Sequence, residues 1–176
     1  MWLWQDRGRS VWGRILAPLK AEDFGSQGTG FASLLWRMQN GELDGYQAKL
    51  VVLQAEDAFF AGDTATRDDG LKDYASKYAA IIAEIRARQP QVKILLFGVF
   101  PRYEADAASA RDNAALKTLG DNESVFFIDM RDRFFLPDGS FDTRLWSPTS
   151  GPLGMQTRTF EVWAEVLQPW IERFVR

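Results

Sequence analysis

The sequence of 176 residues contains no cysteine and no histidine. Without cysteine, disulfide bonds and thiolate metal sites are excluded, and the redox compartment of the protein cannot be inferred. Without histidine, the commonest general base in enzymes is missing, and a serine hydroxyl has no imidazole beside it to activate it at neutral pH. For the chain by itself, chemistry that depends on either residue type is therefore excluded.

Long apolar runs and an excess of basic charge are also missing. No apolar run reaches the ~18 residues that a membrane-spanning helix needs, and MWLWQDRGR at the start is too short and too charged for a signal peptide. The formal net charge is −3 and the basic residues are scattered, so nucleic-acid binding is not expected. We expect a cytoplasmic protein by default, and leave open a signal peptide upstream of Met1.

Aromatic residues are what the sequence has in excess. Hydrophobic residues make up 46% and charged residues 26% of the chain, which is ordinary for one globular domain covering residues 1–176. Seven tryptophans and thirteen phenylalanines are more than usual. They favour an aromatic core and contacts between subunits, with a ligand groove as the less favoured alternative.

Short apolar runs alternate with segments of helical period along the chain. We expect strands at residues 21–24, 50–55, 92–100 and 125–130, and helices at residues 11–16, 31–38, 71–85, 105–119 and 160–174. This alternation predicts an α/β fold with a parallel sheet and helices on both faces. Ligands of such sheets bind beyond the carboxyl ends of the strands.

The stretch from residue 21 to 43 reads as a strand, a glycine-rich turn and a helix in succession. Gly25, Gly28 and Gly30 supply the backbone freedom of a sharp turn, and an apolar helical face with Asn40-Gly41 as its stop follows. Backbone N–H groups at the start of that helix would point beyond the strand ends. The turn is therefore suited to an anion or a developing oxyanion.

Several phrases of the sequence carry a resemblance to a known family. They are VWGRILAPLKAEDFGSQGTGFASLLWRMQNGELD at 11–44, KLVVL at 49–53, QPQVKILLFGVFPR at 89–102, PDG at 137–139 and EVWAEVLQP at 161–169. Together they resemble the SGNH (GDSL-type) hydrolases, and within them the catalytic subunits of intracellular platelet-activating-factor acetylhydrolases. The resemblance implies a three-layer sandwich with a flavodoxin-like, doubly wound parallel sheet of strand order 2-1-3-4-5. It also implies ester hydrolysis and subunits that pair.

The same resemblance implies an active site that this sequence does not complete. The family's serine block, with the first strand that leads into it, is missing before Trp12. Gly28 matches the oxyanion-hole glycine, whereas Ala58 stands at the asparagine position. Gly151 and Gly154 stand at the positions of the aspartate and the histidine of an Asp-x-x-His pair. We therefore assign no catalytic residue, no cofactor and no metal.

Other polar residues are weaker candidates for chemistry. Ser10 and Ser26 could replace the lost serine, but Ser26 reads more simply as a turn hydroxyl. Glu56 and Asp57 could bind a cation, although a solvated loop is the favoured interpretation. Lys117 has no motif around it that indicates a catalytic base.

The leading hypothesis is an inactive SGNH-family domain with a binding or assembly role, pairing as a homodimer and taking a small acyl or carbohydrate ligand. The alternative is an active serine esterase or acetylhydrolase of which the sequence is an N-terminally truncated part, and the third is a decayed gene product. With the first strand missing, the strands near residues 21 and 50 would each leave an edge unpaired. We expect residues 1–4, which are apolar, to lie across that gap.

Overall fold

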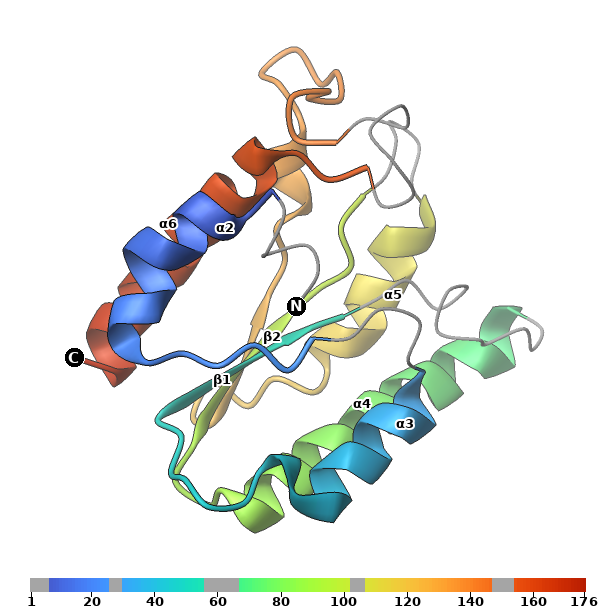
Figure 1. Cartoon of the computed structure of the whole chain (residues 1–176). Helices are drawn as coiled ribbons and strands as arrows, with labels where there is room; N and C mark the ends of the chain where they lie inside the picture. The colour runs from blue at the N-terminus through green and yellow to red at the C-terminus, as the bar shows by residue number, and fades with distance from the viewer. Residues whose placement is uncertain (1–6, 26–29, 56–66, 102–106, 147–153) are drawn as a thin grey trace. The chain divides into compact units, whose positions relative to one another are not determined.

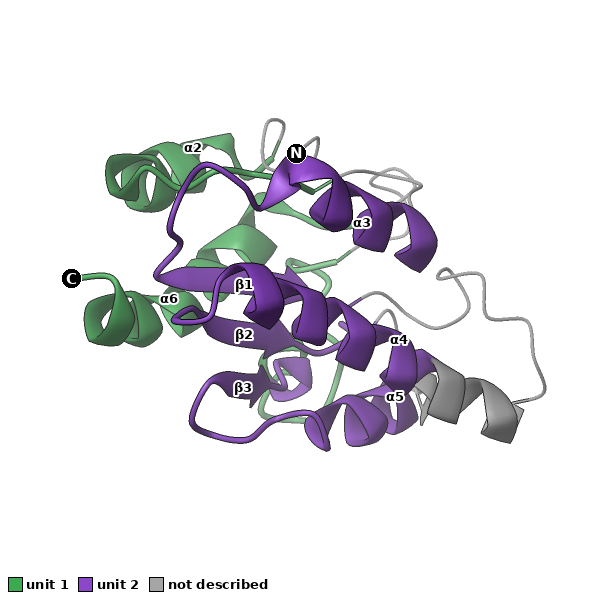
Figure 2. Cartoon of the chain, turned by 90° about the horizontal axis from the view of Figure 1, so that it is seen from below, with its two compact units in different colours: residues 1–28, 133–176 green, residues 29–132 purple. Residues whose placement is uncertain are grey.

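The computed structural model describes residues 7–25, 30–55, 67–101, 107–146 and 154–176. The chain forms two compact units, shown in different colours in Figure 2. Unit 1 comprises residues 1–28 and 133–176, and unit 2 comprises residues 29–132. The expectation of a single domain over the whole chain stays a prediction.

Unit 2 is built on a parallel sheet of three strands. β1 (Leu50–Gln54), β2 (Lys93–Phe97) and β3 (Val125–Ile128) lie in the order β1-β2-β3, with Leu53 opposite Leu96 and Leu96 opposite Phe127. The apolar runs at these positions form strands because a sheet covered on both faces needs no polar alternation. The α/β class and the parallel sheet are confirmed, and the strands follow the order expected for strands 3 to 5.

Three helices of unit 2 accompany the sheet: α3 (Phe31–Arg37), α4 (Arg67–Arg88) and α5 (Ala107–Lys117) (Figures 1 and 2). Ile81 and Ile85 of α4 belong to one buried cluster with Ile94 and Leu96 of β2. The Phe31 ring of α3 meets Tyr74 and Tyr78 of α4 edge to face, with ring centres 5.9 and 4.9 Å away. Aromatic edges of this kind add to the burial that holds α3 on α4.

Unit 1 pairs an irregular helix near the N-terminus with the last helix. α2 (Arg9–Val11) continues as a π-helix (Trp12–Leu16) and a 3-10 turn (Ala17–Leu19), which ends at Lys20 with a left-handed φ of 56°. α6 (Thr157–Phe174) is amphipathic and begins with a capping box between Gln156 and Thr159. Val11 packs against Phe160 and Ala164, so apolar periodicity predicts both helices and their contact faces.

One expected strand is wrong. Residues 21–25 form neither strand nor helix, and the backbone N–H of Ala21 donates to Leu16 O instead of to a strand. Glu22 and Phe24 are exposed, which a buried strand would not allow, and an extended segment becomes a strand only where a neighbour completes its ladder. Residues 1–4, expected across the neighbouring gap, lie outside the described residues.

Candidate functional site

The carboxyl ends of β1 and β2 in unit 2 are joined by a glutamine. The side-chain amide of Gln54, the last residue of β1, donates to Gly98 O at 2.7 Å and to Ala55 O at 2.9 Å. Its own carbonyl oxygen, Oε1, is buried and has no hydrogen-bond partner in the described part of the chain. Gln54 therefore ties together two strand ends at the edge where ligands of parallel sheets bind.

The carboxyl ends of β2 and β3 are joined by Asn113 of α5, which is buried. Its Oδ1 accepts the N–H of Val99 at 2.6 Å, and its Nδ2 donates to Val99 O and Asp129 Oδ1, both at 3.1 Å. A Cβ on Gly98 would lie 2.6 Å from Asn113 Oδ1, so glycine is required there. Asp129 also accepts from the backbone N–H and Nε of Arg131. These polar groups hydrogen-bond the loops that follow β2 and β3, and none of them is an activated nucleophile.

Most residues singled out from the sequence lie outside the described residues: Ser26, Gly28, Glu56, Asp57, Ala58 and Gly151. Ser10 is exposed on α2, and Lys117 is exposed at the end of α5. Across the described ranges, no group of three or more carboxylates could hold a metal ion. No helix in those ranges combines the length and the apolar character that crossing a membrane requires.

Gly154, which the sequence resemblance aligns with the family's histidine, lies within the described residues, unlike Gly28, Ala58 and Gly151. It is buried and has a left-handed φ of 64°. A Cβ built on it would lie 2.1 Å from Cε2 and 2.2 Å from Nε1 of Trp146, distances that real Cβ atoms do not adopt. A histidine at this position would need both a strained backbone and a displaced indole.

The indole of Trp146 is held in place by its surroundings in unit 1. Its ring meets Phe141 edge to face at 6.4 Å, and its backbone forms an antiparallel bridge with Met155. Next to it, Leu145 O accepts the backbone N–H of Gln156 at 3.0 Å and the hydroxyl of Thr159. Sequence reasoning missed this contact, because nothing in the sequence pairs residue 146 with residue 154.

Asp142, the last aspartate of the chain, is also committed to local structure. Its carboxylate accepts the Nε and Nη2 groups of Arg144 at 2.8 and 2.7 Å, and also the Arg144 backbone N–H. These hydrogen bonds outweigh the opposing effect of burial and hold the pKa of Asp142 below its usual range. Asp142 thus stays ionised and paired, in a turn of unit 1.

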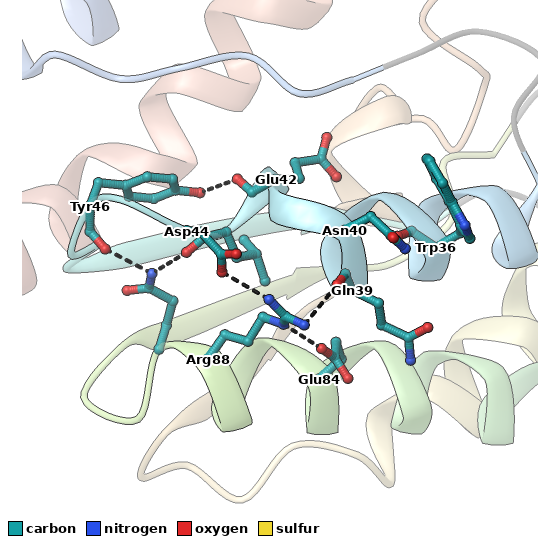
Figure 3. A network of polar contacts seen from close by, with 10 residues as sticks. Trp36, Gln39, Asn40, Glu42, Asp44, Tyr46, Glu84 and Arg88 are labelled. Carbon is teal, nitrogen blue, oxygen red and sulfur yellow. Dashed lines mark hydrogen bonds and ion pairs between the residues drawn. The ribbon is translucent and has the colours of Figure 1, made fainter.

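The phrase LWRMQNGELD, which carries much of the family resemblance, has a structural role in unit 2. α3 runs into a π-helical segment, Met38–Glu42, in which Asn40 and Gly41 leave the helical conformation. Arg88 of α4 holds this segment: its guanidinium bonds Gln39 O and Asp44 Oδ1, each at 2.8 Å, and Glu84 at 2.6 Å (Figure 3). The predicted stop at Asn40-Gly41 is confirmed.

Gln89, the next residue, completes what we call the Arg88–Gln89 clamp. Its side chain is buried. Its Nε2 donates to Leu43 O at 2.7 Å and Tyr46 O at 2.9 Å, and its Oε1 accepts the N–H of Ala48 at 3.1 Å. Three backbone groups of the segment that leads into β1 are thereby satisfied by one side chain. The clamp fixes how the chain passes from α3 to the first strand.

Glu42, the last residue of the π-helical segment, forms an ion pair with Arg37 of α3. One carboxylate oxygen pairs with Arg37 at 3.1 Å, and the side chain is only 10% exposed. Burial raises the pKa of Glu42 above its usual value, and the charge of Arg37 opposes that rise. Arg37 and Glu42 thus form an ion pair between the end of α3 and the π-helical segment, and are part of no catalytic constellation in the described residues.

Similarity to proteins of known sequence identifies the family of this chain. Residues 2–151 match the GDSL-like Lipase/Acylhydrolase family. The human platelet-activating factor acetylhydrolase IB subunit alpha2 is 31% identical over 109 residues, which are 62% of this chain and 44% of the relative. The human alpha1 subunit is 27% identical over 135 residues, 74% of this chain and 55% of the relative. The chain thus spans less than half the length of the alpha2 subunit.

Solved structures agree on the fold. A protein from Streptococcus pneumonia whose name refers to platelet activating factor has a TM-score of 0.64 at 15% identity, covering 82% of this chain and 69% of that one. A Bacteroides fragilis protein described as a candidate acylhydrolase has a TM-score of 0.60 at 18% identity, covering 85% and 73%. Since the family match extends over residues 2–151 of 176, this chain belongs to the GDSL-like lipase/acylhydrolase family.

Proposed function

We propose that this chain is a GDSL-like family domain without hydrolytic activity of its own, and that it serves in binding or assembly. The observation that carries the proposal is the contact at Gly154. The position that the resemblance gives to the catalytic histidine is a left-handed glycine, against which the Trp146 indole packs so closely that no Cβ fits. The surroundings of residue 154 therefore accommodate glycine and leave no space for a side chain.

The chemistry of ester cleavage supports the same proposal. An uncharged serine hydroxyl needs a base to take its proton, and the chain contains no histidine. Asp142 is ionised but bound by Arg144. Binding, in contrast with hydrolysis, needs none of the missing residues, so a small acyl or carbohydrate ligand remains the kind of ligand we propose. A cytoplasmic location also stays a prediction from the sequence.

Hydrolysis of p-nitrophenyl acetate tests this proposal. We expect the purified chain to release p-nitrophenol at the rate of the buffer, because removing the members of a catalytic triad costs several orders of magnitude. The matched control is Ser26→Ala, which should behave identically. Turnover that persists through repurification and disappears in Ser26→Ala would contradict the proposal and favour the active-esterase alternative.

We also propose that the chain forms a homodimer. Trp36, Phe24 and Tyr46 are 63%, 43% and 39% exposed, and large aromatic side chains on a surface favour coverage by a partner. Light scattering should then give twice the chain mass of 20.0 kDa, with the dimer weakened in Trp36→Ser. A particle of 20.0 kDa at all concentrations would contradict this part of the proposal.

A further inference from the structure

The pair Asn40-Gly41 combines a reactive sequence with an unusual backbone. Asparagine is among the least chemically stable residues, and a following glycine has no side chain to hinder attack on it. Both residues are exposed. They depart from helical geometry, with φ −115° and ψ 36° at Asn40 and φ +107° at Gly41. The peptide bond between them therefore lies at the surface, in a kink rather than inside a regular helix.

We propose that Asn40 is a site of spontaneous deamidation, and that the reaction loosens α3 from α4. The backbone nitrogen of Gly41 attacks Cγ of Asn40, the bond from Cγ to Nδ2 breaks, and the proton lost by Gly41 leaves with Nδ2 as ammonia. A five-membered succinimide ring results. Water then opens the ring at either carbonyl, giving aspartate or isoaspartate, and no other reactant is consumed.

The structure also shows what controls the rate. The side-chain amide of Asn40 donates to Trp36 O at 2.7 Å (Figure 3), which holds Cγ against the end of α3. The neighbouring carbonyl of Gln39 is bound by Arg88. Cγ can turn toward the Gly41 nitrogen only after these contacts open, so deamidation depends on local unfolding of this segment.

The product cannot restore the contact that was broken. A carboxylate donates no hydrogen bond to Trp36 O, and it places a negative charge beside the carbonyl end of α3, where the helix dipole disfavours it. Isoaspartate also lengthens the backbone by one carbon within the segment that Arg88 and Gln89 hold. Conversion of Asn40 therefore weakens the Arg88–Gln89 clamp, which in the unmodified protein slows the deamidation of Asn40.

The two other asparagines of the chain serve as internal references. Asn113 is buried and bound at both side-chain atoms. Asn122 is exposed but is followed by Glu123, and its φ of 57° belongs to a tight turn. We expect deamidation to be fastest at Asn40, slower at Asn122 and slowest at Asn113.

Peptide mapping by mass spectrometry during incubation at mildly alkaline pH tests the proposal. The folded protein should accumulate isoaspartate and aspartate at residue 40, and Asn40→Gln should abolish that product. In Arg88→Met the rate should rise about tenfold, which corresponds to about 1.4 kcal/mol of lost closing free energy. The matched control is Arg86→Met, which removes the ion pair with Asp121 from the same helix without touching residues 39–46.

Three outcomes would contradict the inference, two on the reaction and one on its effect. One is an Asn40 that stays intact in the folded protein while it reacts in urea, since the segment would then never open enough. The other is an equal acceleration in Arg86→Met and Arg88→Met, which would mean global rather than local unfolding. The stability of Asn40→Asp supplies the remaining readout: a melting temperature equal to that of the unchanged chain would contradict the loosening of α3.

Discussion

Two regions of this molecule, the segment held by the Arg88–Gln89 clamp and the contact between Gly154 and Trp146, differ in what they contribute to the protein. In unit 2, Arg88 and Gln89 hold residues 39–48, which begin within the phrase LWRMQNGELD, through five hydrogen bonds. In unit 1, Gly154 packs against the Trp146 indole, and we propose that it stands at the position of the family's histidine. On this proposal, the sequence that shapes the scaffold is present, whereas the residue that would act as the catalytic base is replaced by glycine.

This difference separates two reasons for which a family motif can be present: it can stabilise the fold, or it can take part in the reaction. The clamp satisfies backbone groups that would otherwise be buried without partners, so its loss would cost stability whether or not the protein catalyses anything. A catalytic histidine contributes to the reaction and needs no retention once the reaction is lost. Resemblance in LWRMQNGELD thus supports the fold and is silent about activity.

The largest effect is expected at Gly154. Gly154→Ala should destabilise the protein by about 3 kcal/mol or more, because the new Cβ adds a clash with Trp146 to the strain of a left-handed backbone. Gly139 is the matched control, since its φ is 83° but nothing lies within 4 Å of a Cβ. Gly139→Ala should cost only about 1 kcal/mol, measured by chemical denaturation.

Removing the indole sharpens this comparison. In a Trp146→Ala background, the further cost of Gly154→Ala should fall to that of Gly139→Ala, because only the backbone strain remains. An unchanged cost at Gly154 would show that the contact with Trp146 does not determine the glycine.

The next largest effect concerns the clamp. Gln89→Leu should destabilise the protein by about 2 to 3 kcal/mol, because Leu43 O, Tyr46 O and Ala48 N lose their side-chain partner. Gln168→Leu, which changes an exposed glutamine of α6, should be close to neutral. Equal stabilities of the two variants in urea would contradict the role given to Gln89.

The smallest effect is a pH dependence at Asp121, where the chain turns into β3. Burial disfavours its charged form, but hydrogen bonds from the N–H groups of Glu123, Ser124 and Val125 and from the Ser124 hydroxyl outweigh it. The pKa of Asp121 is accordingly lowered from its ordinary value of 3.8. A lowered folded pKa stabilises the protein above 3.8, and that contribution disappears as the pH falls toward the folded value.

Thermal unfolding of Asp121→Asn measures this contribution. The variant should melt below the unchanged chain at neutral pH, and the two melting temperatures should converge below pH 3.8. A difference that is constant with pH would show that the charge of Asp121 is not involved.

The sequence predicted those parts of the fold that have a strong period. The apolar face of α3, the stop at Asn40-Gly41 and the three strands at residues 50, 93 and 125 are local patterns, and each is confirmed. The prediction of a strand at residues 21–24 was wrong, because a strand forms only beside a neighbouring strand, and a local sequence pattern does not show whether one is present.

The candidate site could be predicted only in part. Absence of histidine is visible in the sequence, but Gln54, Asn113 and Trp146 gave no signal, because their partners are brought together by tertiary structure. Gln89 lies just beyond the helix expected at residues 71–85, and its bonds to residues 43–48 depend on the packing of α3 against α4. Side-chain to backbone contacts over such separations have no sequence period.

Labelling with a fluorophosphonate, which reacts with activated serine hydroxyls, tests most directly the proposal that the chain has no catalytic centre of its own. We predict that intact-mass measurement of the folded chain shows no adduct, because no histidine is present to activate a serine. An adduct on a single serine, absent from the unfolded chain and from the corresponding Ser→Ala variant, would contradict the account.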